Sequence, residues 1–448
     1  MPSFIFEPVL LFSRYQRLLW CLYRYGVAGG LASLGFECGK RGVLWIAPKS
    51  AKKVEFDSVF GKNLARTFQE MGPTFIKLGQ VLATRPDIVG EGVAKELEVL
   101  YSGVRTISLK EVKKILVREL GKKKVNGEIL SIEETPLGSA SIGQCHRATL
   151  KDGSSVVIKI QKPGVSDLIR LDLKLLEWFV KPAAAAFPKL GLNEMYQDFK
   201  ESTFREIDYR QEAKNIDQFK KNFRRVLTGS NVVFPKYYPK LSTSKVIVLE
   251  PMRGKPISDL EKGTRSAKQA AFKGLSAVLE QIFEHGFFHA DPHSANVFFV
   301  EEEGRMGFID MGLVGQLEEK DKRLFLKVLM SIIKRDRKLV AQSLFQLGTP
   351  GKATKYDKFE KEIEALLEQV KSEGLENVKL DQMVTKLMAI ARRNQIYIPN
   401  RYVMMIRSCL IIEGVAKSLD PDVSVLKVAV PVVAKGLLKS YNPLKKLM

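Results

Sequence analysis

The sequence predicts an α+β fold in which an N-terminal helical extension precedes a small, sheet-rich lobe and a larger helical lobe. Three observations predict it. Apolar residues recur at helical spacing between residues 53 and 120, short apolar strands flank the turn Lys151–Gly153, and a mostly helical pattern runs from Lys268 to the end. With 448 residues, of which 45% are apolar, the chain can bury the cores of two or three domains.

The helical extension is predicted from a stripe of apolar residues at three- and four-residue steps. Gly72 and Pro73 interrupt this stripe, so one helix should end near Met71 and the next should carry Pro73 in its first turn. A further amphipathic helix is expected over 107–120, ending at Gly121. The apolar stripe consists of Leu64, Phe68, Met71, Phe75, Leu78 and Leu82.

The small lobe is predicted from short strands, and the helical lobe contains one apolar strand pair. We expect four parts: an amphipathic, membrane-facing segment 1–52, the extension 53–125, the small lobe 126–250 and the helical lobe 251–448. The predicted strands are 142–149, 155–160, 231–234, 245–250, 297–300 and 306–309, and the helices of the small lobe are 167–180 and 193–223.

The strongest local motif is Phe288–Asn296, followed after the strand pair by Asp310-Met311-Gly312. An Asp five residues before an Asn, and then a second Asp-x-Gly, is the pattern that phosphoryl transfer requires. Asp291 would orient the attacking hydroxyl, while Asn296 and Asp310 would hold Mg²⁺ against the nucleotide phosphates. An ordinary acidic turn is the alternative, which the Pro and two His residues in the same nine positions disfavour.

A small-residue loop between two strands, followed by Lys159, is the second motif. Small residues let backbone N–H groups approach phosphate oxygens, and a lysine on the next strand neutralises their charge. Such a loop alone is weak evidence, and Lys159 alone would suggest a solubilising residue. Their position upstream of the Asp/Asn/Asp set is what indicates a phosphate-binding role. The predicted phosphate-binding residues are Gly138, Ser139, Ala140, Ser141, Ile142 and Gly143.

With these motifs on the chain, a resemblance to a known family is visible over roughly residues 60–420. Lys77-Leu78-Gly79-Gln80, Glu206-Ile207-Asp208 and Glu212-Ala213-Lys214-Asn215 join the loop and the Asp/Asn/Asp set. Together they resemble the UbiB family of atypical kinases, the aarF-domain kinases linked to ubiquinone and other isoprenoid-lipid metabolism. The resemblance implies a two-lobed, protein-kinase-like fold that binds ATP and Mg²⁺.

The resemblance also implies roles for individual residues. Lys159 would contact the α- and β-phosphates and pair with Glu212 on a helix, and Asp291 would be the catalytic-loop carboxylate. Asn296 and Asp310 would be the metal ligands. None of these charged groups is missing, although Met311 replaces the phenylalanine usual after the metal-binding Asp.

The extension carries the family-specific part of the implied site. Lys77 and Gln80 would reach into the nucleotide pocket, with Lys77 paired to Glu206 or Asp208, and Glu250 completes the predicted nucleotide-binding set. From the residues alone, the helix face of Lys77 and Gln80 would be solvated, and Glu206 and Asp208 would form a surface ion-pair ladder. The implied extension covers the pocket where a protein substrate would sit.

The net charge of +22 requires a partner or a strongly basic surface. Residues 1–50 hold six Lys/Arg against two acids, and 423–448 hold five lysines and no acid. Neither end contains a charge-free apolar run long enough to span a bilayer, so both are expected to lie on a membrane or to pack on the protein. We expect a peripheral protein on the cytoplasmic side of an anionic or isoprenoid-containing membrane, with lipid-biosynthesis enzymes as partners. Nucleic acid is not expected to be a partner, because no stripe of alternating aromatic and basic residues is visible.

These expectations give one leading function and two alternatives. The leading function is an ATP- and Mg²⁺-dependent atypical kinase or ATPase that supports isoprenoid-quinone or related lipid metabolism. A small-molecule phosphotransferase and a nucleotide-sensing scaffold are the alternatives to it.

His285, His289 and His293 recur every four residues and would suggest zinc on one helix, but Gly286 and Pro292 argue against that helix.

Overall fold

The chain forms two compact units, each of which mixes helices with small sheets, so the predicted α+β class is confirmed. The first unit contains residues 1–209 and 238–249, and the second contains 210–237 and 250–448. Of the two ends expected to face a membrane, residues 28–50 and most of 423–448 lie outside the described residues. The computed structural model describes residues 3–27, 51–85, 89–101, 106–186, 191–224, 232–334, 336–351, 354–373, 380–423, 428–429 and 431.

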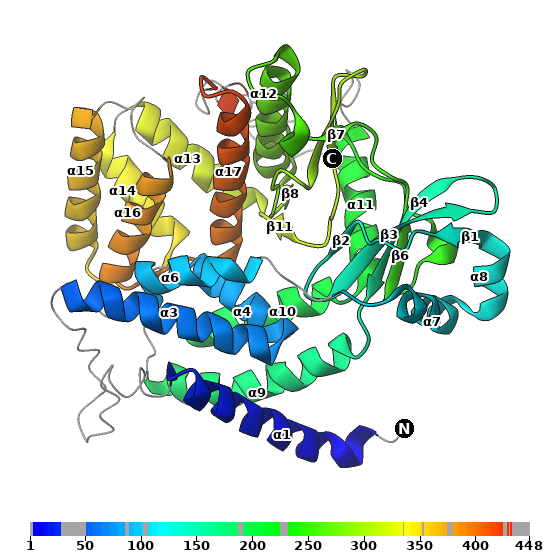
Figure 1. The fold of residues 1–448 in the computed structure, drawn as a ribbon. Coiled ribbons are helices and arrows are strands. Elements are labelled where there is room, and N and C mark those ends of the chain that lie inside the picture. The colour runs from blue at the N-terminus through cyan, green and yellow to red at the C-terminus, as the bar shows by residue number, and fades with distance from the viewer. Residues whose placement is uncertain are drawn as a thin grey trace, which may run out of the picture. The chain divides into compact units, whose positions relative to one another are not determined.

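The first unit begins with the helical extension and continues into a five-stranded sheet (Figure 1). Its helices are α1 (Ser3–Arg24), α3 (Ala51–Met71), α4 (Pro73–Ala83), α6 (Glu91–Leu97), η1 (Glu98–Tyr101), α7 (Leu109–Leu120), α8 (Lys122–Glu128), α9 (Val165–Ala186), α10 (Leu192–Glu206) and η3 (Pro239–Leu241). Its strands are β1 (Ile129–Ile132), β2 (Gly138–Ser139), β3 (Gly143–Leu150), β4 (Ser155–Gln161) and β6 (Val246–Leu249).

The extension is built around one apolar core shared by α1, α3, α4, α6, α9 and α10. Gly72 separates α3 from α4 with φ +95°, a value that L-residues with side chains rarely adopt, and Pro73 opens α4 as predicted. Phe68, Met71 and Phe75 of the predicted stripe are buried in this core. In the part of the chain that the structure describes, no helix is both long and apolar enough to cross a membrane.

The sheet is antiparallel, with strand order β1-β3-β4-β6 and with β2 paired to β3. Along β4 the alternation of Val156, Ile158 and Ile160 sends one face into a core, as period-two patterning dictates. Helix α7 closes this core with Val112, Ile115 and Leu116. Ser108 and Glu111 form a capping box that fixes its N-terminus.

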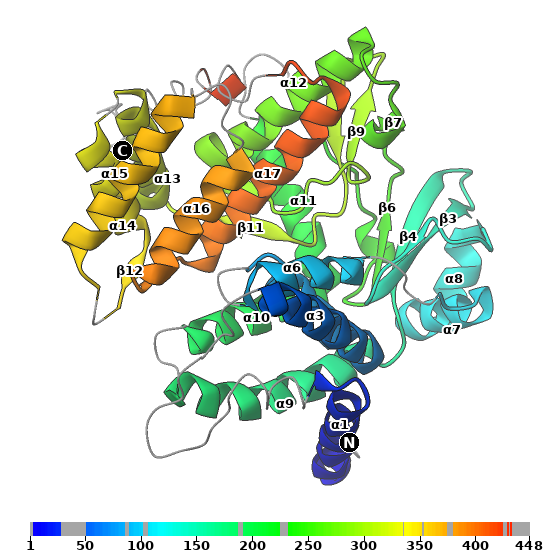
Figure 2. The same cartoon turned by 60° about the vertical axis from the view of Figure 1, so that its left-hand side comes forward.

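The second unit combines a four-stranded sheet, ordered β5-β10-β9-β7, with helices (Figure 2). Helix α12 packs along α17, while α14, α15 and α16 share a separate apolar core. Its strands are β5 (Val232–Val233), β7 (Lys255–Pro256), β8 (Phe287–His289), β9 (Val297–Val300), β10 (Arg305–Phe308), β11 (Val314–Gln316), β12 (Thr349–Pro350) and β13 (Ile396–Tyr397). Its helices are α11 (Tyr209–Arg224), η4 (Ile257–Asp259), α12 (Arg265–Glu280), the π-helical turn η5 (Gln281–His285), α13 (Glu319–Ile333), α14 (Arg337–Leu347), α15 (Tyr356–Glu373), α16 (Leu380–Arg393) and α17 (Asn400–Leu419).

The structure differs from the sequence predictions in several places. The helical stretch predicted for 193–223 is two helices, because the chain turns at Ile207 and Asp208 between α10 and α11. The pairs β8–β11 and β12–β13 were not predicted. Each of these strands has only two or three residues, too few for a periodicity to emerge.

Candidate functional site

The Asp/Asn/Asp set is assembled in the second unit by a strand, a turn and a hairpin. Strand β8 ends at His289, and backbone hydrogen bonds from His293 to Asp291 (2.8 Å) and from Asn296 to His293 (2.8 Å) fold the following residues into a turn. Asn296 Nδ2 donates to the Asp291 carbonyl across 3.3 Å. The amide is therefore oriented with Oδ1 as the atom able to bind a cation.

The β9–β10 hairpin returns the chain to this turn. The Ile309 N–H donates to the Asn296 carbonyl at 3.0 Å, which brings Asp310, the next residue, to the same end of the hairpin. Asp310 has φ +56°, in the left-handed region that Asp and Asn tolerate better than most residues. The predicted metal ligands Asn296 and Asp310 therefore lie at the same end of one hairpin.

His289 connects the two acidic segments. Its Nδ1 accepts a hydrogen bond from the Asp291 N–H (3.0 Å), and its Nε2 donates to the Ile309 carbonyl (3.0 Å). Burial lowers the pKa of His289, so the ring is the neutral tautomer that these two hydrogen bonds require. His289 thus ties Asp291 to the residue before Asp310.

Asn215 of α11 contacts the other side of the Asp310 segment. Its Nδ2 donates to the Met311 carbonyl at 2.7 Å, and its Oδ1 accepts from Gln211 at 3.0 Å. Asn215 is buried, so this hydrogen bond is not exchanged easily for water. The Glu212–Asn215 motif therefore contributes a residue that positions the Asp310 loop.

Arg407 is a site residue that the sequence reasoning missed. Its Nη2 lies 3.3 Å from Asp291 Oδ1, and the neighbouring Ser408 Oγ donates to the His289 carbonyl at 2.7 Å. Both belong to α17, which is distant in sequence. An Arg-Ser pair inside the apolar run Val403–Ile412 was the only signal available.

The predicted phosphate loop lies in the first unit, where β2 turns into β3. Ala140 N–H donates to the Gly143 carbonyl (2.9 Å), and Lys162 Nζ donates to the Ala140 carbonyl (2.7 Å). Within the described part of the chain, the N–H groups of Ser141 and Ile142 have no hydrogen-bond partner. These are donors of the kind that bind phosphate oxygens.

Lys159 lies on β4, in the interior of the sheet, opposite Cys145 of β3 and Ile247 of β6. Its Nζ lies 5.4 Å from the centre of the Tyr209 ring, close enough for a cation–π interaction. Lys159 is therefore not on an edge strand, which removes the solubilising interpretation. Because Lys159 and Glu212 belong to different units, their predicted pairing stays a prediction.

In the extension, Lys77 forms an ion pair with Glu206, the first of its two predicted partners. The Lys77 side chain is only 12% exposed, so its helix face is not simply solvated. Gln80 Nε2 donates to the Leu100 carbonyl at 3.0 Å, which ties α4 to η1. Asp208 follows Ile207 in the turn between α10 and α11.

Two further predicted residues are placed by backbone contacts and burial. Glu212 is buried on α11, whereas Glu250 follows β6 and donates its N–H to the Lys236 carbonyl at 2.7 Å. His146 is buried between Gln144 Nε2 and the Glu133 carbonyl, each at 2.8 Å, which is a structural role.

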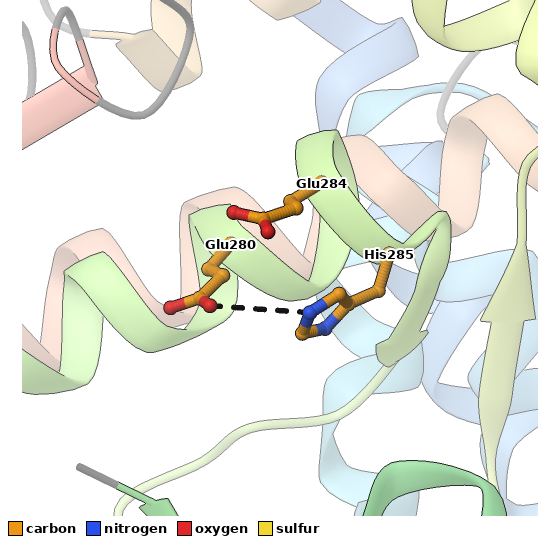
Figure 3. A group of neighbouring side chains, drawn as sticks. All are labelled: Glu280, Glu284 and His285. Carbon is orange, nitrogen blue, oxygen red and sulfur yellow. Dashed lines mark ion pairs between the residues drawn. The ribbon is translucent and has the colours of Figure 1, made fainter. Parts of the chain in front are cut away.

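The three histidines considered for zinc do not share a helix. Strand β8 and the turn after it carry His289 and His293, while His285 ends the π-helical turn η5. His285 instead lies beside Glu280 and Glu284, with its Nε2 3.9 Å from Glu280 Oε1 (Figure 3). One ligand atom from each of these three residues lies within 4.8 Å of the others. This cluster is separate from the Asp/Asn/Asp set.

Comparison with known proteins gives two family matches. Residues 99–344 match the ABC1 atypical kinase-like domain, and residues 363–424 match the UbiB helical domain. The first match alone covers more than half of the chain. The structure in that range, a small antiparallel sheet followed by a helical unit with the Asp/Asn/Asp set, has the kinase-like arrangement predicted from the sequence.

Individual relatives agree with this assignment. A Pseudomonas putida (strain W619) protein named probable protein kinase UbiB is 32% identical over 394 residues, which are 86% of this chain and 72% of that protein. An uncharacterized protein in the hydrogenase 1 5′ region of Clostridium pasteurianum is 31% identical over 83% of this chain and 70% of its own length. Among solved structures, the Rv3197–erythromycin complex of Mycobacterium tuberculosis matches with TM-score 0.44 and 21% identity, over 77% of this chain and 90% of that one. The chain therefore belongs to the UbiB family, whose members carry the ABC1 atypical kinase-like domain.

Proposed function

We propose that this protein is an ATP- and Mg²⁺-dependent atypical kinase or ATPase that supports isoprenoid-quinone or related lipid metabolism at a membrane surface. One observation carries the proposal. Asp291, Asn296 and Asp310 gather on one hydrogen-bonded element, with His289 between them. A carboxylate next to an Asn/Asp pair is the arrangement that phosphoryl transfer uses.

The residues fit magnesium. Asn296 and Asp310 supply an amide oxygen and a carboxylate, the hard oxygen ligands that Mg²⁺ prefers. Asn296 is buried and its amide orientation is fixed by the hydrogen bond to Asp291, so Oδ1 is held in place. When bound, Mg²⁺ neutralises charge on the nucleotide phosphates.

The residues also fit the phosphates of ATP. The Ser141 and Ile142 N–H groups provide two donors at the tip of the loop, and Lys159 adds a positive charge from β4. Lys77 and Gln80 belong to the proposed nucleotide-binding set, although both also bind groups of their own unit. Glu206, Asp208 and Glu250 complete that set.

Within this proposal, Asp291 orients the attacking hydroxyl and Arg407 positions Asp291. Glu212 would pair with Lys159. The hydrogen bonds of His289 and Asn215 hold the Asp291 and Asp310 segments in position. The lipid role rests on family membership and on the basic charge of the chain. A nucleotide-sensing scaffold is the second candidate, in which the Arg407–Asp291 ion pair would hold the carboxylate away from a reacting hydroxyl instead of positioning it.

The test is ATP hydrolysis with Mg²⁺, with and without anionic liposomes, for the wild type and Asp310→Asn. Asn keeps the left-handed backbone and removes only the charge, so the variant should fold and lose turnover. Turnover that rises with liposomes and disappears in Asp310→Asn supports the proposal. If a fluorescent ATP analogue binds to both proteins and neither hydrolyses ATP, the scaffold function replaces it.

A further inference from the structure

Helix α1 has two apolar faces, and only one of them is buried in the protein. Leu11, Leu18 and Cys21 face the core of the extension. Six other apolar or aromatic residues of the same helix are exposed, with Tyr23 at 81% and Phe12 at 58%. We call these six the α1 stripe: Val9, Leu10, Phe12, Leu19, Trp20 and Tyr23.

Helix α9 extends this exposed surface. It packs beside α1, as both ribbon views show, and the Phe179 ring stacks on Tyr15 of α1 with 6.2 Å between ring centres (Figures 1 and 2). Phe179 and its neighbour Trp178 are themselves exposed. Two helices therefore present large aromatic side chains to the outside, which monomeric surfaces rarely do without a partner.

The charges around the α1 stripe are basic on balance, although Arg24 lies 3.9 Å from Glu70 and Arg14 pairs with the buried Asp172. Residues 8–24 contain Arg14, Arg17 and Arg24 and no carboxylate, and the one acid before them, Glu7, pairs with Lys174 of α9. The Arg24 guanidinium lies 4.7 Å from the centre of the Trp20 ring, so cation and aromatic ring are held together. Along α9, exposed Arg170 adds a positive charge, whereas Lys181 pairs with Glu177 at 2.8 Å.

The stripe is held in place by a buried ion pair. Arg14 Nε and Nη2 donate to the two carboxylate oxygens of Asp172 at 2.8 and 2.9 Å, and Thr74 Oγ1 donates to Asp172 Oδ2 at 2.7 Å. Asp172 is fully buried, so breaking this pair would leave a buried charge uncompensated. Helix α1 therefore presents the stripe in a fixed orientation, so that binding has to order only the exposed side chains.

We propose that the α1 stripe, with Trp178 and Phe179, is a docking surface for an anionic phospholipid bilayer. An amphipathic helix with Trp, Tyr and Phe beside Arg and Lys lies in the bilayer interface, with its aromatic residues at headgroup level and its cations on lipid phosphates. A second copy of the chain is a poorer occupant, because the exposed basic groups of α1 and α9 outnumber the carboxylates of Glu7, Glu70 and Glu177, so two copies would bring mostly like charges together. This inference deepens the membrane part of the proposed function and is independent of its catalytic part.

The test is flotation of the full chain with vesicles of phosphatidylcholine, alone or mixed with phosphatidylglycerol, without nucleotide. The stripe variant is Phe12→Gln/Trp20→Gln. Its matched control is Phe272→Gln, because Phe272 on α12 is 54% exposed, like Phe12, but lies in the other unit. We expect the wild type and Phe272→Gln to float only with phosphatidylglycerol, and the stripe variant to bind about tenfold less or more weakly still. A second variant, Arg17→Gln/Arg24→Gln, should reduce the dependence on phosphatidylglycerol.

Three results would overturn the proposal. The wild type could fail to bind either vesicle, or the stripe variant could bind as tightly as Phe272→Gln. Alternatively, sedimentation could find a wild-type dimer that the stripe variant loses, which would assign the surface to a second copy. Thermal unfolding checks that each variant is folded. Asp310→Asn should float like the wild type. A wild type that floats but does not hydrolyse ATP would contradict the catalytic proposal and leave the docking proposal intact.

Discussion

Arg407 Nη2 of α17 donates a hydrogen bond to Asp291 Oδ1 across 3.3 Å, which joins the C-terminal helix to the candidate catalytic carboxylate. We expect Arg407→Ala to lower the rate of ATP turnover about tenfold, because Asp291 loses the group that fixes its rotamer. The affinity for ATP should stay unchanged, since no nucleotide-binding role is proposed for Arg407. Arg401→Ala is the control, because it removes a different arginine–aspartate pair from the same helix. An unchanged rate in Arg407→Ala would contradict the positioning role.

Asn215→Ala should weaken the binding of Mg²⁺, because it disturbs the loop that carries Asp310. The substitution leaves the Met311 carbonyl without its 2.7 Å donor, which costs about 1–2 kcal/mol of stability. We expect half-maximal turnover to require a higher Mg²⁺ concentration. Gln218→Ala removes a comparable amide pair, with Asn222, from an exposed part of the same helix and should change neither property. If both variants behave alike, Asn215 does not act on the loop.

The Lys77–Glu206 ion pair should couple measurably, because both side chains are partly buried. We expect a double-mutant cycle of Lys77→Ala and Glu206→Ala to give a coupling free energy of about 1 kcal/mol in urea unfolding. The exposed pair of Lys181 and Glu177 on α9 is the control and should give about 0.3 kcal/mol or less. Equal coupling in the two pairs would mean that burial adds nothing at Lys77.

Gly143 is the loop position that cannot carry a side chain. A Cβ there would clash with the Tyr209 hydroxyl and lie 3.0 Å from the Ile160 carbonyl. Gly143→Ala should therefore cost about 1–3 kcal/mol of stability, and Tyr209→Phe should recover part of it. Gly138→Ala has open space around the new methyl group and should be neutral within about 0.5 kcal/mol. Thermal denaturation of the wild type, Gly143→Ala, Gly143→Ala/Tyr209→Phe and Gly138→Ala distinguishes these cases.

Asp321 should make stability depend on pH in the acid range. Burial alone would raise its pKa, but hydrogen bonds from Tyr402 (2.5 Å), the Glu318 N–H (2.9 Å) and Arg401 make the net shift downward from 3.8. A carboxyl with a depressed pKa stabilises the fold above its unfolded pKa, and this stabilisation is lost as pH falls through the folded pKa. The unfolding free energy of Asp321→Asn should therefore be below that of the wild type at pH 6, and the difference should begin to narrow only below about pH 4, as the pH falls toward the depressed folded pKa. A constant difference at every pH would contradict this.

The sequence predicted those parts of the site whose residues lie close together along the chain. Asp291 and Asn296 are five residues apart, and one hairpin separates them from Asp310, so local spacing was sufficient to identify them. Arg407 lies 116 residues from Asp291, and no periodicity records that contact. Asp172 is a second example. Its position on a predicted helix gives no sign of a partner, but the structure buries it against Arg14. Charged residues whose partners lie far away in sequence were the ones that pattern reasoning could not assign.

The Arg14–Asp172 pair also sets an order of events during protein synthesis. Its two members are 158 residues apart, so α1 is made long before the helix that neutralises its arginine. At usual elongation rates the delay is roughly 10 to 30 s. Throughout that interval the face of α1 that the fold buries lacks its neighbour α9, which makes the nascent helix a candidate client for a chaperone. Completion of the first unit must then wait for the ribosome to deliver α9, and a stall upstream of that point would release a segment prone to aggregation.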